Sequence, residues 1–524
     1  MYTPCSGSTL NTRDKEPNHA AAAVACELPL HPDLEASDQR EKREERREKR
    51  KERREKREER EREKMALVQE RALQGVGPRS KRLRTSVRAR SFFRRSDSSS
   101  NAKAKAEAEA EAEASTRGGA LEIRTVKSVS EVDRDEWNAC ANGSGEVNPF
   151  LSWEFLSALE ESGSVSARQG WQPMHAVLTR NEKETEGTKG TEGNNNNGVL
   201  GVCPLYLKGH SYGEYVFDHS WAQAYTRVTG RSYYPKIQSC VPFSPVTGNR
   251  LLVKSGEHRE ESLKLLSNSL VAVADQMQGV SSLHVTFNTE EERQQLCTDA
   301  GYLSRFGIQY HWHNKGYESF DDFLMHLRQS KRKAIRQERK YVLQKSGLKV
   351  YRKMGSEMSA KDWDDFYRFY INTCNKKWGE AYLNRDFFHL LGELLQDKVM
   401  VVFVEDAAGR KVAGALNLVG SDTLFGRNWG CKNGLNVKHL HFEVCYYQAL
   451  DAAIELGLGK VEAGAQGEHK IQRGYLPTLT YSAHYIKDPR FRTVVKDFLK
   501  QEQQQIDYTL DVLNQELSPY KKSG

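Results

Sequence analysis

The chain lacks the features that would assign it to several large classes of protein at once. Its nine cysteines contain no C-x-x-C pair, and their odd number argues against a disulfide framework, so zinc-ribbon, thioredoxin-like and disulfide-stapled proteins are excluded. No apolar run reaches the roughly 18 residues that a membrane-spanning helix needs. The first residues also lack the charged-then-apolar order of a secretory signal peptide.

The chain also has little net charge once its N-terminus is set aside. The 524 residues carry a formal charge of +8. Residues 1–118 hold 29 Lys and Arg against 22 Asp and Glu, a balance of +7. The rest of the chain is therefore close to neutral, and the basic composition gives no ground for a nucleic-acid-binding function.

Two N-terminal segments, 1–64 and 65–118, have compositions that do not form a packed core. Residues 39–64 contain no apolar side chain, so they form either a lone solvated helix or sequence translated from upstream of the true start, and we favour the second interpretation. Residues 65–118 begin at Met65 with a segment rich in Arg and Ser and poor in acidic residues, as organelle transit peptides are. We therefore expect an organelle, a chloroplast rather than a mitochondrion, or otherwise the cytoplasm.

Folded sequence begins near Leu121, and its elements recur in the same order in two halves. The most specific repeat ends each half: Gly301–Leu303 reads GYL and is followed by His311, and Gly474–Leu476 reads GYL and is followed by His484 at the same offset. An ordered repeat of this kind indicates internal duplication. The sequence predicts an α/β (α+β) fold of two tandem domains, 119–315 and 316–524, each a mixed central sheet flanked by helices.

The second half carries a string that resembles a known family. The string EAGAQGEHK…RGYLP, with FLMHLRQSKRKAIRQERK and FGRNWGC upstream of it, is similar to the FemAB-like peptidoglycan biosynthesis/recognition family of the GNAT acyltransferase superfamily. The resemblance covers residues 148–498 and implies that both domains are GNAT-like. It also implies transfer of an aminoacyl group from aminoacyl-tRNA to an amine of a peptidoglycan precursor, although a fold likeness alone does not license that reaction.

One departure from the superfamily bears on the donor. GNAT enzymes that use acetyl-CoA carry an Arg/Gln-x-x-Gly-x-Gly/Ala turn whose N–H groups hold pyrophosphate, and this chain has none. Acyl-CoA and aminoacyl-tRNA both stay open as donor co-substrates, and we expect no tightly bound cofactor. We expect no metal either, because the spacing of His439 and His441 matches no zinc site.

The loop after the strand at Val461–Gly464 gathers the groups that acyl transfer to an amine requires. Such a reaction needs a base, donors for the oxyanion and cations for a phosphate-bearing substrate. Gly464 and Gly467 permit a tight turn and close approach of a ligand. We expect catalytic roles for Glu468, His469 and Lys470, and the resemblance matches Lys470 to the lysine of a Phe-Lys dipeptide in the family. A solvated loop is the alternative for the same residues.

Further residues are candidates for binding substrate. They are charged or polar neighbours in the same loop, aromatic residues near glycines at strand and loop ends, and a histidine at a helix N-terminus, where anions are favoured. Packing in the core is the alternative for the aromatic residues. The candidates are Glu462, Gln466, Arg473, Trp378, Tyr382, Arg427, Trp429 and His441.

The sequence therefore predicts an N-acyltransferase or aminoacyltransferase-like protein that acts on an amine-bearing small molecule or peptide. The alternatives are a non-catalytic protein that recognises a peptidoglycan-like peptide or an RNA, and an acyl-CoA-dependent N-acetyltransferase. A basic helix at Arg328–Tyr341 makes tRNA a candidate partner. Ser482 and His484 share one strand face, and we expect them to be scaffold. The sequence gives no oligomeric state.

Overall fold

The computed structural model describes residues 120–181, 198–377, 380–464 and 467–521. These residues belong to one compact unit, which spans Arg94–Gly524. The predictions for residues 1–118 lie outside the described residues, as do Trp378 and Gln466.

The first half is built mainly of strands with five helices between them. Its strands are β1 (Ala120–Val126), β2 (Trp171–Pro173), β3 (His175–Asn181), β4 (Gly198–Cys203), β5 (Tyr206–Lys208), β6 (Lys236–Ser239), β7 (Leu252–Val253), β8 (Ser282–Asn288) and β9 (Leu303–His313). Its α-helices are α3 (Arg134–Ala141), α4 (Trp153–Glu161), α5 (His219–Thr229), α6 (Arg259–Gln276) and α7 (Glu290–Asp299). Short 3₁₀ turns are η1 (Val129–Glu131), η2 (Pro149–Leu151) and η3 (Ala167–Gln169).

The second half repeats the alternation of helices and strands. Its strands are β10 (Lys349–Met354), β11 (Val399–Glu405), β12 (Lys411–Val419), β13 (Thr423–Cys431), β14 (Lys460–Glu462) and β15 (Leu476–Ile486). Its α-helices are α8 (Phe320–His326), α9 (Gln329–Lys340), α10 (Ala360–Lys377), α11 (Arg385–Leu395), α12 (Leu440–Phe442), α13 (Gln448–Glu455) and α14 (Pro489–Glu516). Single turns are the π-helices η4 (Tyr341–Lys345) and η7 (Glu443–Tyr447), and the 3₁₀ turns η5 (Gly355–Glu357), η6 (Gln396–Lys398) and η8 (Glu468–Arg473).

Two sheets contain these strands. Four strands in the order β1-β3-β4-β7 form one sheet, and eleven in the order β10-β11-β12-β13-β14-β9-β15-β8-β6-β5-β2 form the other. The mixed α/β fold that the sequence predicts is confirmed by these elements and sheets. The apolar run Gly198–Gly209 forms two strands, because β4 and β5 on either side of Pro204 join different sheets.

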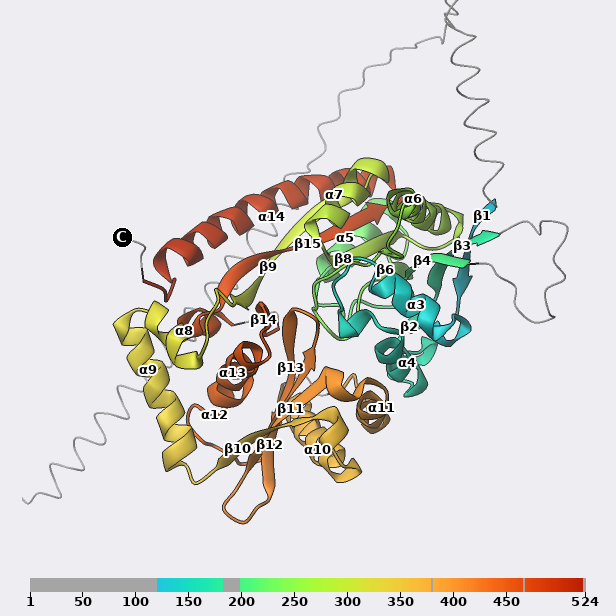
Figure 1. Cartoon of the computed structure of the whole chain (residues 1–524). Helices are drawn as coiled ribbons and strands as arrows, with labels where there is room; N and C mark the ends of the chain where they lie inside the picture. Colours follow the sequence, from blue (N-terminus) through green and yellow to red (C-terminus); the bar gives the residue numbers. More distant parts are fainter. Residues whose placement is uncertain (1–119, 182–197, 378–379, 465–466, 522–524) are drawn as a thin grey trace, which may run out of the picture. The chain divides into compact units, whose positions relative to one another are not determined.

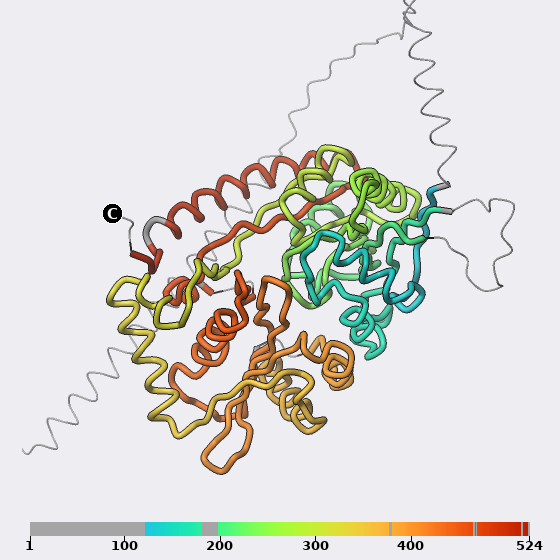
Figure 2. The backbone as a smooth tube through the Cα atoms, in the orientation of Figure 1, coloured from blue at the N-terminus to red at the C-terminus, as the bar shows by residue number. Residues whose placement is uncertain are grey.

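The last strand of each half pairs with strands of the other half (Figures 1 and 2). In the first half β6 lies parallel to β8, and β8 pairs with β15 of the second half. In the second half β13 lies parallel to β14, and β14 pairs with β9 of the first half. The two exchanged strands then pair with each other at the centre of the large sheet. Matching pairings in both halves are what a duplication produces.

The two GYL repeats occupy matching places in this exchange. Gly301 and Gly474 both have positive φ, at 68° and 96°, which glycine adopts without strain. The strands that follow are 11 residues each and pair so that Leu476 faces His311 and Leu303 faces His484. The register is thus symmetric about the middle of the β9–β15 pair. This symmetry supports duplication as the origin of the two halves.

The two halves also share a hydrophobic core. Helix α4 begins at the cap Ser152, whose hydroxyl accepts from the Phe155 amide, and α11 begins at Asn384, whose side chain accepts from the Phe387 amide. The two helices pack together, and the rings of Phe155 and Phe387 meet edge to face with centroids 5.9 Å apart. One continuous core cluster extends from the first half into the second. Helix α14 lies along the exchanged strands β9 and β15 (Figure 1).

Candidate functional site

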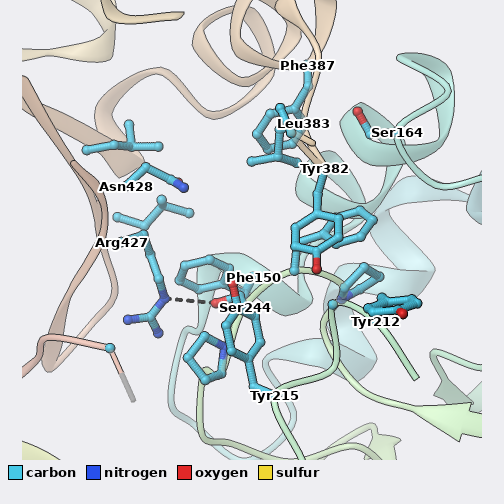
Figure 3. A pocket seen from close by; sticks show the side chains of 18 of the residues that line it. Phe150, Ser164, Tyr212, Tyr215, Ser244, Tyr382, Leu383, Phe387, Arg427 and Asn428 are labelled. Carbon is cyan, nitrogen blue, oxygen red and sulfur yellow. Dashed lines mark hydrogen bonds between the residues drawn. The ribbon is translucent and has the colours of Figure 1, made fainter. Parts of the chain in front are cut away.

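A cavity of about 1020 Å³ lies between the two halves. Figure 3 shows the side chains around it: Arg427 and Asn428 lie on one side, and Tyr382, Leu383 and Tyr212 lie across from them. The first half supplies residues of two loops, 210–217 and 242–245, together with side chains of α4 and its surroundings. The second half supplies the loop before α11, strand β13, and the chain after β14.

The cavity occupies a place where two parallel strands separate. Strands β13 and β14 pair over three residues only, and the last pair joins Phe425 to Glu462. Beyond it Arg427 and Asn428 continue along β13, while Gly464 already lies in the loop after β14, and all three line the cavity. Residues past the last pair still bond to β12 on their other side. A ligand can therefore approach the unpaired edge of β13 directly.

The matching place in the first half is filled by the protein itself. Strands β6 and β8 also pair over three residues, ending at Ser239 and Val285. The following loop is pinned there by Arg250, which is buried and donates from Nε to the Thr286 carbonyl (3.1 Å) and from Nη2 to the Val246 carbonyl (2.6 Å). Among the described residues, only the second half keeps its gap open.

A buried ion pair forms the floor beside this gap. Arg427 Nη2 lies 3.4 Å from Glu462 Oε2, and its Nε donates to the Ser244 hydroxyl at 2.8 Å, as the dashed line in Figure 3 marks. Burial lowers the pKa of Arg427, although Glu462 opposes that effect. The Thr247 hydroxyl donates to Glu462 Oε1 at 2.5 Å. Both bonds join the two halves, because the hydroxyls come from the first half and the ion pair from the second.

Glu462 itself does not reach the cavity. Its side chain is 1% exposed and is absent from the cavity lining. Burial raises its pKa, but His311, Lys460, Arg427 and the Thr247 hydroxyl outweigh burial and hold the pKa at about 2. Glu462 is therefore an anion that compensates Arg427, and any contact it makes with a substrate is indirect.

Lys470 is placed at the cavity with its ammonium group largely out of water. It lies in η8, and its Nζ donates to the Gly464 carbonyl at 2.9 Å. The side chain is 2% exposed and lines the cavity. Burial, with a smaller contribution from Arg427, lowers the pKa of Lys470 from 10.5 to about 7. At neutral pH this lysine is therefore present in both protonation states.

His469 and His441 lie at the same cavity as Lys470. The His469 ring nitrogen Nε2 is 2.9 Å from the Tyr446 hydroxyl, and Tyr446 also lines the cavity. The His441 and His469 ring centroids are 6.4 Å apart. Two sequence candidates thus join Lys470, and Tyr446 is a partner that the sequence analysis did not single out. Helix η7, which contains Tyr446, is a π-helix, a form that occurs frequently at functional sites.

Arg473 is held away from the cavity by its neighbours. Its Nη2 donates to both carboxylate oxygens of Glu338 at 2.9 and 3.0 Å, and its Nη1 donates to the His469 carbonyl at 2.8 Å. Its guanidinium carbon lies 3.3 Å from the centre of the Phe442 ring. Arg473 is not among the lining residues. The bonds from Arg473 to Glu338 connect η8 to α9 and thereby fix the position of Lys470.

The remaining candidates divide between the cavity and other places. Tyr382 lines the cavity, and its ring stacks on Phe243 of the first half with centroids 5.0 Å apart and planes at 10°. Trp429 does not line it, although its ring packs edge to face on His441 at 5.4 Å. The Glu468 backbone belongs to η8, but its side chain lies outside the described residues.

Several lining residues were missed because they come from the first half. They are mainly aromatic: Trp171, Tyr212, Tyr215, Phe217 and Phe243. The signal available in the sequence was the cluster HSYGEYVF at 210–217. Ser482 and His484 are buried and do not line the cavity, in agreement with a role in the scaffold.

The described residues contain no cluster of three or more His, Cys, Asp or Glu side chains suited to a metal ion. Among the same residues, no helix has the length and apolar composition that crossing a membrane requires.

The family model named FemAB-like, described as peptidoglycan biosynthesis/recognition, matches residues 128–522. The chain therefore belongs to the FemAB-like family, as the sequence string predicted. A search of curated proteins found no match to the chain.

Several solved structures match the chain at low identity and low TM-score. One is the crystal structure of FemX, at 11% identity and a TM-score of 0.43, covering 70% of this chain and 98% of that one. Another is L-PGS from Bacillus licheniformis, at 12% identity and a TM-score of 0.38, covering 68% and 98%. A third is a GCN5-related N-acetyltransferase from Sphaerobacter thermophilus, at 9% identity and a TM-score of 0.29, covering 70% and 95%.

Proposed function

We propose that the protein transfers an acyl or aminoacyl group to an amine, with Lys470 as the residue that handles the proton. The observation that carries the proposal is a buried lysine with a pKa of about 7, located where β13 and β14 separate. A general base works best when its pKa lies near the working pH. Membership of the FemAB-like family supports the same class of reaction.

The reaction follows from the two protonation states of Lys470. The acceptor enters as an ammonium ion and gives a proton to the neutral Lys470 amine. The resulting free amine attacks the acyl carbon, a C–N bond forms, and the carbonyl oxygen becomes an oxyanion near the Lys470 ammonium and Arg427. The bond from the acyl carbon to its carrier then breaks, the carrier leaves as a hydroxyl or thiol with the proton from Lys470, and the amide nitrogen loses its remaining extra proton to water.

The same cavity suits an anionic carrier on the donor. Two cationic side chains of the second half, Arg427 and Lys470, belong to the lining, and the unpaired edge of β13 offers main-chain groups to an extended donor. Aminoacyl-tRNA and acyl-CoA both have an anionic carrier, and both remain in the proposal. His469, whose ring lies against the Tyr446 hydroxyl, is exposed and lies between the cavity and solvent.

The test is product formation by the full chain and by two lysine variants. Amine acceptors are incubated with aminoacyl-tRNA or acyl-CoA, and the amide is detected by mass spectrometry. Lys470→Met is expected to lower turnover at least a hundredfold, in the range of a lost general base. Lys487→Met is the matched control, because Lys487 Nζ also donates to main-chain carbonyls, of Ala274 and Met277, and does not line the cavity. Full turnover by Lys470→Met, or ligand binding with no product in wild type, contradicts the proposal.

A chloroplast location remains part of the proposal. It is carried by the composition of residues 65–118 alone.

A further inference from the structure

Three aromatic side chains at the cavity are exposed to an unusual degree. Tyr212 is 59% exposed, Phe217 is 58% exposed and Tyr382 is 36% exposed, and all three line the same cavity. Single exposed rings are common on protein surfaces, but a group of them around one cavity indicates a binding surface. Figure 3 shows Tyr212 and Tyr382 on the same side of the cavity, across from Arg427.

The backbone beneath these rings is strained. Tyr215 and Phe243, both in the lining, have φ of 58° and 59° without being glycine. Bulky residues rarely adopt this left-handed conformation, and when they do it is often at a ligand site. The two loops also approach closely, since a Cβ placed on Gly213 would lie 2.7 Å from the Phe243 ring.

Two buried lysines hold the loop of residues 210–217 from below. Lys236 Nζ lies 2.7 Å from Glu214 Oε1 and 2.5 Å from Asp218 Oδ2, and the lysine is 1% exposed. Lys208 Nζ lies over the Trp171 ring at 3.3 Å and donates to the Tyr212 carbonyl at 2.9 Å. Burying a charged group lowers the stability of a protein. Here the two buried lysines fix the position of the 210–217 loop. The aromatic wall is thus formed before any ligand arrives.

We propose that this aromatic wall, made of Tyr212, Tyr215, Phe217, Phe243 and Tyr382, binds a planar apolar ring carried by the amine acceptor. The proposal rests on the proposed function and names its acceptor class as an arylalkylamine. The wall belongs mainly to the first half, whereas the gap that suits the donor belongs to the second. Rings stack on rings in this wall already, as the Phe243–Tyr382 pair shows, and a third flat ring finds matching surfaces there.

The charged side chains of the cavity favour entry of the acceptor beside Tyr382, on the side of the aromatic wall. Among the described residues of the lining, Glu380, two residues before Tyr382, is the carboxylate, and it is exposed. Aromatic faces also attract an ammonium group. An arylalkylammonium ion therefore meets favourable charge as it enters beside Tyr382. It then finds Lys470 deeper in a lining that carries cations, where losing its proton becomes easier.

The test measures binding directly, so it does not depend on turnover. The full chain with Lys470→Met is titrated by calorimetry with phenethylamine, 2-cyclohexylethylamine and hexylamine, which differ in ring planarity at similar size. Phenethylamine is expected to bind about tenfold more tightly than the other two, in line with the energy of ring stacking. The double variant Tyr212→Ala/Phe217→Ala is expected to remove that preference. Tyr508→Ala serves as the control, because Tyr508 is exposed on α14 and does not line the cavity.

Each outcome is decisive for the wall. Equal binding of the three amines, or a preference that survives in the double variant, overturns the proposal. Binding of adenosine through the same two residues without binding of phenethylamine also overturns it, because the ring would then belong to a nucleotide carrier on the donor. If phenethylamine binds selectively and wild type gives no product, the proposed role of the aromatic wall stands and the proposed transfer reaction is refuted. The two proposals can therefore fail separately.

Discussion

Replacing Lys470 by methionine is expected to stabilise the protein while it abolishes turnover. Burial lowers the pKa of Lys470 from 10.5 to about 7. The difference, at about 1.4 kcal/mol per pH unit, corresponds to about 5 kcal/mol of folding free energy lost below pH 7. Methionine has a similar length and no charge to desolvate, and the lost bond to the Gly464 carbonyl offsets about 1 kcal/mol of the gain.

The sign and the pH window of this effect follow from proton binding. Between about pH 7 and 10.5 the unfolded chain keeps the Lys470 proton and the native protein does not. The stability of wild type therefore rises with pH in this window relative to the variant. The advantage of Lys470→Met is expected to be largest at pH 6 and to shrink by about 3 kcal/mol at pH 9.

Urea unfolding of wild type and Lys470→Met at pH 6, 7, 8 and 9 measures this difference. The matched control is Lys487→Met, which removes a lysine that does not line the cavity. A stability difference between wild type and Lys470→Met that is independent of pH would refute the claim that the native site disfavours the charged lysine.

Three other predictions concern the supports of the site and the N-terminus. Lys236→Met leaves two buried carboxylates without their cation and is expected to destabilise the protein by about 3–5 kcal/mol in urea unfolding, whereas an unchanged midpoint would contradict the anchoring role. Arg427→Ala removes one of the cations that compensate the buried Glu462 carboxylate and is expected to cost about 3 kcal/mol in urea unfolding; adding Glu462→Gln, in the double variant Arg427→Ala/Glu462→Gln, is expected to recover part of the loss, and no recovery would contradict their coupling. A fluorescent reporter fused to residues 65–118 is expected to enter chloroplasts, and a cytosolic reporter would refute targeting.

Local patterns predicted the elements and the repeat well. Helices α4 and α11 each present an apolar face after a capping residue, Ser152 and Asn384, and both features are local in the sequence. The GYL repeats led to matching strands, since a glycine with positive φ and a buried tyrosine are local requirements. The exchange of β9 and β15 was not predicted, because strand pairing is a long-range property that one sequence does not encode locally.

The site was predicted only in its second half. The loop Glu462–Arg473 contains Lys470, which lines the cavity, but the charged side chains of Glu462 and Arg473 form ion pairs within the fold instead. Glu462 and Arg473 each pair with a residue far away in the sequence, Glu462 with Arg427 and Arg473 with Glu338. A charge in a loop cannot by itself reveal whether it will meet a ligand or another part of the chain.

The sequence did not identify the aromatic wall of the first half as part of the site, for a related reason. Aromatic residues such as those at 210–217 are usually core residues, and composition cannot distinguish a ring that faces a cavity from one that is packed. Only the fold brings this loop opposite Arg427 and leaves its rings exposed.

The dependence of kcat/KM on pH tests the role of Lys470 most directly. An acceptor amine and a donor that give product are used at pH 5.5 to 9, with wild type and Lys470→Arg compared. We expect the wild-type kcat/KM to rise with pH through an inflection near 7, where Lys470 loses its proton, and the variant, whose guanidinium stays charged, to lack that limb. A wild-type profile with no inflection near 7, or the same inflection in Lys470→Arg, would show that another group takes the proton.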